Sequence, residues 1–363
     1  MRLIHCADWH LDAKMETGLD SVRARERRVE LLLTFSHLIE VAEREGASAV
    51  LLAGDLFDSD RATEKTRRFV GDAIASHPAL TFVSVRGNHD ASLSPLFEGN
   101  VPPANWHDLS DGEGWGRVAL GEGVAVYGRT CPKTPEDYDS LAVSDGDTFR
   151  IVLLHGQVSG GLATGEDRIA LGRLTDRGID CLALGHEHSA RCEVLDARGV
   201  WAYAGCPEGR GFDECGDKGC MLIDTDRRGT EAVRFLSLCR RRLHEIPVLL
   251  DGCTSFGDVY ARVTDAVATI DSCDMVKVVL TGEIAPEVVR DTVHLSRVLN
   301  ERFYFARVKD ECRLLLRPED YLGDISLKGE FIRTVLASPL SDEQKQRTIL
   351  AGLRALRGEE VDA

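Results

Sequence analysis

The sequence contains no apolar run of about 20 residues, the length that a helix needs to span a bilayer. It also lacks a basic segment followed by a long apolar stretch, which is typical of a secretory signal. Internal repeats and low-complexity segments are absent as well. We therefore expect a cytoplasmic protein that does not enter a membrane.

A nucleotide-binding motif and a surplus of positive charge are also missing. The phosphate loop G-x-x-x-x-G-K-[ST] does not occur, so any ATP-driven step must come from another polypeptide. The chain has 60 Asp and Glu residues but only 44 Lys and Arg residues, which gives a net charge of -16. This balance argues against a broad basic face for nucleic acid, since basic side chains supply the non-specific affinity for phosphates. Bound metal ions can still make one site locally positive.

Cysteines are present, but not in the paired motifs of zinc sites. The eleven cysteines are an odd number and lie mainly in apolar, strand-like segments, as Cys6 and Cys181 do. This distribution favours reduced thiols over a disulfide framework. Three cysteines cluster without a paired CxxC spacing, where we expect loop thiols, with a structural zinc as the alternative: Cys206, Cys215 and Cys220.

With 363 residues, 43% of them hydrophobic, the chain can bury more than one core. Apolar runs and helical periodicity alternate at the start and predict a βαβαβ order with right-handed crossovers. Shorter strand candidates follow residue 123, whereas 108–123, rich in glycine and acidic residues, is predicted to be a surface loop. We expect an α/β fold, a mixed-sheet β-sandwich flanked by helices, over residues 1–239.

A second βαβαβ block is predicted at residues 240–318, which is small for a catalytic domain but sufficient for an α+β cap domain. A helical C-terminal tail, residues 319–363, completes the chain. Its second helix opens with Ser341 and Gln344 in the spacing of a capping box.

Polar clusters follow five of the apolar runs, at the points where buried strands would end. Side chains at the carboxyl ends of neighbouring strands converge on one crevice, which is where chemistry collects in such sheets. The clusters are Asp8-Trp9-His10, Gly54-Asp55-Leu56-Phe57-Asp58, Gly87-Asn88-His89-Asp90, His155-Gly156 and Gly185-His186-Glu187-His188.

These residue types suit a pair of metal ions that hydrolyses a phosphate ester. Asp55, directly after a strand and a glycine, is the best candidate for a carboxylate that bridges both ions. Asp8 and His10 alternate on an extended segment and so reach one ion together, and His186 and His188 project together in the same way. Asn88 adds an amide oxygen and His155 an imidazole. Nitrogen and oxygen ligands suit Mn²⁺, Fe²⁺ or Zn²⁺, and the sequence does not choose among them.

Each cluster alone is a weak signal. Asp-x-His is common, a single strand-end histidine is more often hydrogen-bonded than metal-bound, and Gly-Asn-His-Asp is also an ordinary turn. The joint occurrence of all clusters in order favours a dinuclear site, and five of the eleven histidines fall in them. The other six histidines are interpreted as structural.

The five clusters together resemble the calcineurin-like metallophosphoesterases. Within that superfamily, the segment Gly205-Cys206-Pro207-Glu208-Gly209-Arg210-Gly211-Phe212 is similar to the SbcD-like DNA-repair exonucleases, and the short chain is most similar to their smaller YhaO-type members. The resemblance implies a metallophosphoesterase fold, two divalent ions, most often Mn²⁺, and DNA as the substrate. It also implies a homodimer and an SMC-like coiled-coil ATPase (SbcC-like) as the partner.

Residue roles follow from the resemblance position by position. One ion would be held by Asp8, His10, Asp55 and His188, and the other by Asp55, Asn88, His155 and His186. The resemblance makes His89 the catalytic histidine, which would either donate to a phosphoryl oxygen or protonate the leaving oxygen. Asp58 stands where some relatives carry a histidine, so it either orients His89 or pairs with an arginine. Arg210 either contacts the substrate phosphate or pairs with Asp213 or Glu214.

The leading hypothesis is a DNA exonuclease or endonuclease that acts at DNA ends with an ATPase subunit. The alternatives are a phosphodiesterase for small nucleotides and a regulatory subunit that binds DNA ends without cutting them. Apolar residues in 93–106, namely Leu96, Phe97, Val101 and Trp106, are predicted to form the dimer patch. The tail is predicted to dock on the ATPase or to pack on its own cap domain.

Overall fold

The computed structural model describes residues 1–15, 18–59, 62–90, 93, 96–97, 101–110, 112, 114–162, 164–315, 321 and 323–356. Its contacts divide the chain into two compact units, Met1–Arg242 and Leu243–Ala363. The residues predicted as cap and tail thus fall in one unit.

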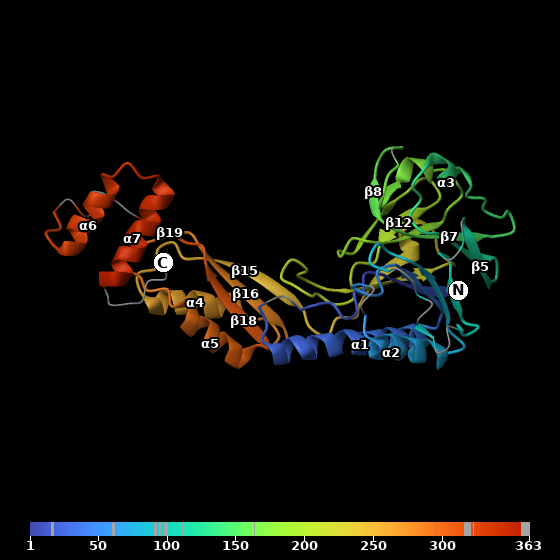
Figure 1. The fold of residues 1–363 in the computed structure, drawn as a ribbon, viewed down its shortest axis with the longest axis horizontal. Coiled ribbons are helices and arrows are strands. Elements are labelled where there is room, and N and C mark those ends of the chain that lie inside the picture. Colours follow the sequence, from blue (N-terminus) through green and yellow to red (C-terminus); the bar gives the residue numbers. More distant parts are fainter. Residues whose placement is uncertain are drawn as a thin grey trace. The chain divides into compact units, whose positions relative to one another are not determined.

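Two six-stranded sheets form the first unit (Figure 1). The first has the order β14 (Val233–Ser237), β13 (Gly219–Asp224), β1 (Arg2–Cys6), β2 (Ala47–Ala53), β3 (Thr81–Val85) and β4 (Trp106–Asp108). The second has the order β11 (Arg191–Val194), β12 (Val200–Tyr203), β10 (Cys181–Gly185), β7 (Phe149–His155), β6 (Val124–Gly128) and β5 (Gly116–Gly121). A short pair, β8 (Gln157–Ser159) and β9 (Arg168–Ala170), lies outside both.

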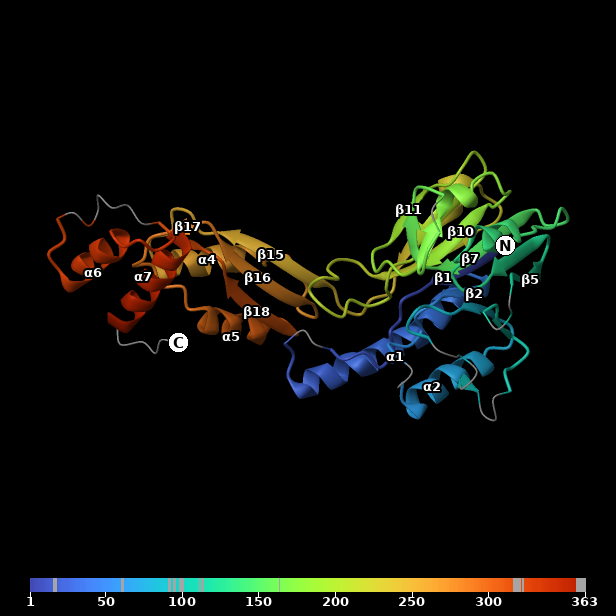
Figure 2. The same cartoon turned by 45° about the horizontal axis from the view of Figure 1, so that its top comes forward.

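The alternation of side chains along each strand explains the layers of this unit. Leu3 and Leu51 point between the sheets and pack against the second sheet. Ile4 and Val50 point outward, where α1 (Ser21–Arg44) and α2 (Glu64–Ala75) cover them (Figure 2). The short helix α3 (Pro135–Asp139) helps to cover the outer face of the second sheet through Tyr138. Because the central strands β2, β3, β7 and β10 are buried on both faces, their sequences are apolar runs.

One polar side chain crosses the sandwich. His5 is fully buried, and its Nε2 donates to the carbonyl oxygen of Leu184 at 3.0 Å, which ties β1 to β10. Its Nδ1 has no hydrogen-bond partner, so a second proton there would be buried without an acceptor. Burial accordingly lowers the pKa of His5 from 6.5 to about 4.

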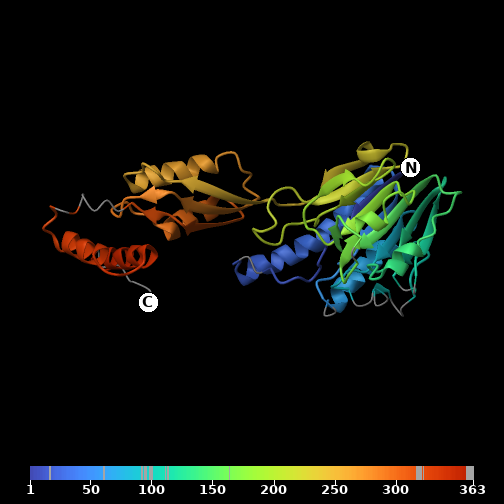
Figure 3. The same cartoon turned by 90° about the horizontal axis from the view of Figure 1, so that it is seen from above.

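The second unit is built on a parallel sheet of β15 (Leu243–Leu249), β16 (Met275–Thr281) and β18 (Phe305–Asp310). Two helices pack on it through a shared core: α4 (Phe256–Ala266), the gold helix in Figure 3, and α5 (Thr292–Arg302). β17 (Glu283–Ile284) pairs with β19 (Arg313–Leu314). Helices α6 (Leu327–Leu336) and α7 (Asp342–Leu356) pack on each other around Leu314 and Tyr321. The predicted capping box is present, since Ser341 and Gln344 exchange hydrogen bonds of 3.0 and 3.3 Å.

These observations confirm the predicted fold class, a mixed-sheet sandwich with flanking helices, and the second βαβαβ block. All eleven cysteines are free thiols. None of the described helices is both long and apolar enough to cross a membrane. The prediction of a loop over 108–123 is wrong in part, because 116–121 forms the edge strand β5. There Val118 and Leu120 alternate with exposed residues and pack on the core between the sheets.

The predicted dimer patch is also wrong. Leu96, Phe97 and Trp106 are only 3%, 8% and 7% exposed, because they pack with α2 in the outer core. A Cβ on Gly71 of α2 would lie 2.1 Å from the carbonyl oxygen of Leu96, so the two segments touch closely. Only Val101 is exposed, at 73%, and residues 94, 95 and 98–100 lie outside the described residues. The homodimer therefore stays a prediction without this patch.

His5 predicts a pH dependence of stability. Its folded pKa, about 4, lies below the unfolded value of 6.5. Its stabilising contribution is therefore fully present above pH 6.5 and is lost as the pH falls toward 4, by about 3 kcal/mol. The stability advantage of the wild type over His5→Gln should shrink by this order between pH 7 and pH 4.

Urea unfolding in the presence of a chelator, followed by tryptophan fluorescence, measures this difference. All four tryptophans lie in the unit Met1–Arg242, so the signal reports on the unit that contains His5. A difference between the two proteins that does not change with pH would contradict the assignment.

Candidate metal centre

The loops that follow β1 and β2 run side by side and are hydrogen-bonded to each other. The amide of Asp8 donates to Gly54 at 3.1 Å, and the amide of His10 donates to the carbonyl of Asp55 at 3.0 Å. The loop after β3 joins them, because the carboxylate of Asp90 accepts hydrogen bonds from the amides of Leu56, Phe57 and Gly87. The three predicted clusters therefore form one hydrogen-bonded unit at the ends of their strands.

The backbone of this unit is unusual. Asp8, His10 and Asp55 have left-handed φ values of 53°, 43° and 52°, and His186 has a φ of 109°. Such conformations are costly for residues other than glycine and are concentrated at functional sites. Gly87 shows how closely the loops approach, since a Cβ there would lie 2.1 Å from Oδ1 of Asp55. The same oxygen accepts a hydrogen bond of 2.9 Å from the amide of His89.

Asp8, Asp55 and His155 form one fully buried group that could hold a metal ion. Burial lowers the pKa of His155, so its ring is neutral. Its Nδ1 lies 2.9 Å from the carbonyl oxygen of Ala53 and must donate to it. Nε2 is then a lone pair, yet it faces Oδ1 of Asn88 at 2.9 Å and Oδ2 of Asp55 at 3.4 Å. Three acceptors that face one another are an arrangement that fits a bound cation.

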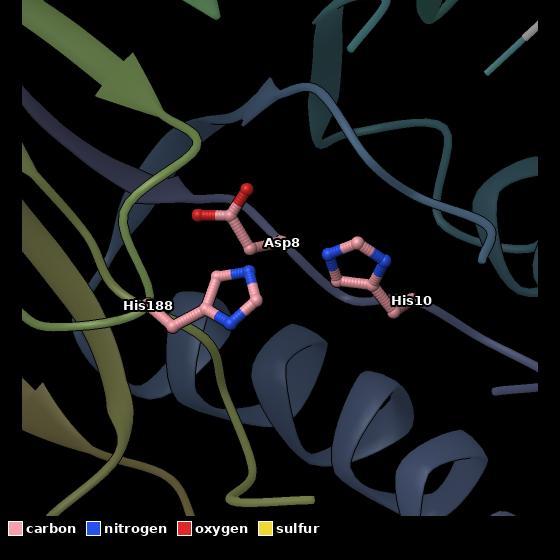
Figure 4. A group of neighbouring side chains, drawn as sticks. All are labelled: Asp8, His10 and His188. Atoms are coloured by element: carbon pink, nitrogen blue, oxygen red, sulfur yellow. The ribbon is translucent and has the colours of Figure 1, made fainter. Parts of the chain in front are cut away.

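Asp8, His10 and His188 form a second group, which shares Asp8 with the first (Figure 4). His10 is 3% exposed, and neither of its ring nitrogens has a hydrogen-bond partner. Burial, with the nearby positive charge of Arg210, lowers the pKa of His10 to about 2, so the ring is neutral. A buried neutral imidazole with both nitrogens unsatisfied is costly by itself and suits a metal ligand.

Asp8 belongs to both groups. Its carboxylate accepts the amide of His186 at 2.9 and 3.1 Å. Burial nevertheless raises the pKa of Asp8 well above its usual value, and the neighbouring Asp55 adds to the increase. A cation bound here would favour the charged form and reverse this effect. The donor set of carboxylates, imidazoles and an amide oxygen therefore fits a pair of divalent ions.

His10, Asp58 and His89 form a third group at the solvent side of the site. Nδ1 of His89 donates to the backbone carbonyl of Asp58 at 2.8 Å, which leaves Nε2 of this exposed ring free for another contact. The carboxylate of Asp58 lies 3.3 Å from Nδ1 of His10 and 3.6 Å from Nη1 of Arg210. The backbone of Asp58 thus contacts His89 and its side chain lies beside Arg210, while the role of the Asp58 carboxylate stays a prediction.

The remaining predicted residues lie at the same site. The ring of His186 packs edge-on against that of His155, with 5.3 Å between the centroids. Among the described residues, however, His186 is in none of the groups with metal-ligand spacing. Arg210 pairs with Glu214 at 2.8 Å, as one of its predicted alternatives has it. Although burial opposes the charge, hydrogen bonds from His188 and Arg210 hold the pKa of Glu214 below its usual value.

A buried ion network that the sequence analysis did not predict anchors the loop of Arg210. Glu208 and Arg27 are each 1% exposed, and their side chains form an ion pair of 3.0 Å. Glu208 also accepts from Thr34 at 2.8 Å and from the amide of Arg240 at 2.6 Å. Arg27 donates to the carbonyl of Gly209 at 2.9 Å. The loop next to the metal groups is therefore fixed to α1.

Residues 1–190, which contain all five clusters, match the calcineurin-like phosphoesterase family. The chain belongs to this family. Its members use dimetal centres, in agreement with the adjacent groups of candidate ligands around Asp8 and Asp55.

Relatives within the family confirm the predicted resemblance to SbcD-like and YhaO-type proteins. The DNA double-strand break repair protein Mre11 of Saccharolobus solfataricus is 28% identical over 62% of this chain and 60% of its own length. The metallophosphoesterase YhaO of Bacillus subtilis is 27% identical over 61% and 57%. The SbcD component of the nuclease SbcCD of Bacillus subtilis is 24% identical over 64% and 68%. The chain thus spans about three-fifths of the first two relatives.

The position of Asp55 predicts how its replacement changes metal binding. Replacement by alanine should abolish tight binding of both ions, because Oδ2 of Asp55 lies 3.4 Å from Nε2 of His155 and 3.6 Å from Nε2 of His10, one histidine from each proposed ligand set. Equilibrium dialysis against Mn²⁺ followed by metal analysis measures the stoichiometry. Asp72→Ala, an acidic residue exposed on α2, is the control and should bind as the wild type does. Two tightly held ions in the Asp55 variant would show that this carboxylate does not bridge them.

Proposed function

We propose that the chain is a Mn²⁺-dependent DNA exonuclease or endonuclease that hydrolyses phosphodiester bonds at DNA ends. The observation that carries the proposal is the pairing of two adjacent ligand groups, both of which include the buried Asp8, with a solvent-facing histidine, His89, whose Nδ1 is already fixed. The ligand sets implied by resemblance, with Asp55 shared, remain part of the proposal. The names of the relatives, a double-strand break repair protein and a nuclease component, support DNA as the substrate.

Phosphodiester hydrolysis needs a nucleophile, charge stabilisation and a proton donor, and different groups of the site supply them. When bound, a pair of divalent ions supplies a nucleophile at neutral pH and stabilises charge on the phosphoryl oxygens. His89 fills the role that remains, because its protonated ring can donate from Nε2 to the leaving oxygen while Nδ1 holds Asp58. Arg210 lies within the same site and adds positive charge in a chain whose net charge is -16.

His89 provides the test of the chemistry. His89→Ala should retain both ions and lower the rate of cleavage of linear duplex DNA by about 10² to 10⁴-fold, the usual effect of losing a general acid. His37→Ala is the matched control, because His37 lies on α1 and is paired with Glu40, outside the site. Cleavage by the His89 variant at the wild-type rate would remove this residue from the chemistry.

The substrate is tested by comparing linear duplex, covalently closed circular DNA and cyclic nucleotides, each with Mn²⁺ and with a chelator. Cleavage of linear DNA that needs Mn²⁺ supports the proposal. Hydrolysis of cyclic nucleotides alone would establish the small-nucleotide alternative. Binding of DNA ends without cleavage would establish a regulatory role.

The same proposal includes an SMC-like coiled-coil ATPase as the partner, with residues 240–318 guiding DNA and 319–363 docking on the ATPase. The segment that leads into α6 supports this role, because Ile325 and Leu327 are 99% and 72% exposed. Other apolar side chains of α6 and α7, such as Ile332 and Ile349, are already buried around Leu314. The two helices therefore pack on their own unit and still present apolar side chains to solvent.

Replacing Ile325 and Leu327 together by aspartate should abolish a complex with a coiled-coil ATPase co-expressed from the same organism. Size-exclusion chromatography of the co-expressed pair measures it. Val194→Asp, a site 66% exposed in the first unit, should leave the complex intact. The docking assignment is wrong if the double variant elutes with the ATPase as the wild type does.

A further inference from the structure

Glu214 is a buried acid next to the candidate metal groups. It is 6% exposed, and its Oε1 lies 2.6 Å from Nδ1 of His188. The same oxygen accepts from Nη2 of Arg210 at 2.8 Å, and Oε2 accepts from the amide of Arg210 at 2.7 Å. The Glu214 carboxylate thus binds the ring of His188, a member of the second metal group. It also binds Arg210 four residues earlier, which stabilises the loop that carries both residues.

The contact with His188 determines which ring nitrogen carries the proton. An ionised carboxylate only accepts hydrogen bonds, so Nδ1 of His188 must be the donor. Nδ1 also lies 3.1 Å from Nη2 of Arg210, but a protonated Nδ1 cannot accept from it, and the arginine donates to Glu214 instead. Nε2 is then left as the lone pair of His188 that faces the site with Asp8 and His10. Histidines that bind metals are commonly fixed in this way by a carboxylate.

The backbone of His188 is held as well. Its carbonyl oxygen accepts from Nζ of Lys218 at 2.8 Å. Glu214 on the ring and Lys218 on the backbone together fix the orientation of a side chain that is still 30% exposed.

The geometry also decides against Glu214 as a ligand itself, although His188, Cys206 and Glu214 lie close enough to share an ion. Both oxygens of Glu214 already accept hydrogen bonds, two of them shorter than 2.8 Å. The Cys206 thiol is buried and donates to the carbonyl oxygen of His188 at 3.5 Å.

We propose that Glu214 is a positioning residue that fixes the tautomer and orientation of His188 for metal binding. This inference rests on the proposed metal centre and adds to it a residue outside the ligand sets. Loss of such a carboxylate typically weakens metal affinity by about 10 to 100-fold.

The test compares Glu214→Gln with Asp213→Asn, the neighbouring acid, which is exposed. Calorimetric titration with Mn²⁺ should give two ions in both variants, with one of them bound about 10 to 100-fold more weakly in Glu214→Gln only. Nitrogen NMR of the metal-free protein, with the His188 signal assigned from a His188→Asn variant, should show the Nδ1–H tautomer in the wild type and a mixture in Glu214→Gln.

Wild-type affinity together with an unchanged tautomer in Glu214→Gln would overturn the inference. Loss of one ion at saturating Mn²⁺ would overturn it too, because Glu214 would then be a ligand. A wild-type protein that binds no Mn²⁺ would contradict the proposed function instead, and the tautomer of His188 would still decide whether Glu214 fixes the ring.

Discussion

Two carboxylates buried next to each other impose the constraint on which the site depends. Asp8 and Asp55 are 0% and 3% exposed, and burial raises the pKa of Asp8. His10 and His155 are neutral, again because of burial, so they contribute lone pairs and no positive charge. Unpaired buried charge is among the most costly features of a fold. Divalent cations are the counter-charge that carboxylates, imidazoles and an amide oxygen can share.

The fold makes this arrangement possible by supplying other contacts around it. Asp90 joins the loops of β2 and β3 by hydrogen bonds to the amides of Leu56, Phe57 and Gly87. His5 ties the two sheets together beneath the site. The ion pair of Glu208 and Arg27 fixes the loop that carries Arg210 and Glu214 to α1. Strained backbone at Asp8 and Asp55 persists because these contacts determine it from several sides.

The features of the fold and site that could be predicted from the sequence are those that local patterns determine. Apolar runs marked β1, β2, β3, β7 and β10, and polar residues directly after them were expected at one edge, where the structure brings them together. The features that were predicted wrongly or missed are determined by tertiary packing. Leu96, Phe97 and Trp106 were expected to be exposed because nothing in the local sequence shows that they pack on α2. The bond between Glu214 and His188 joins residues 26 positions apart, and no spacing rule predicts it.

The proposed metal centre holds two ions together with Asp55 between them. Anomalous diffraction from crystals grown with Mn²⁺ tests it most directly. We expect two peaks about 3.5 to 4 Å apart, the separation of two-metal phosphoesterase centres, with the Asp55 carboxylate in contact with both. A single peak, or a peak held by Cys206 and Glu214, would contradict it.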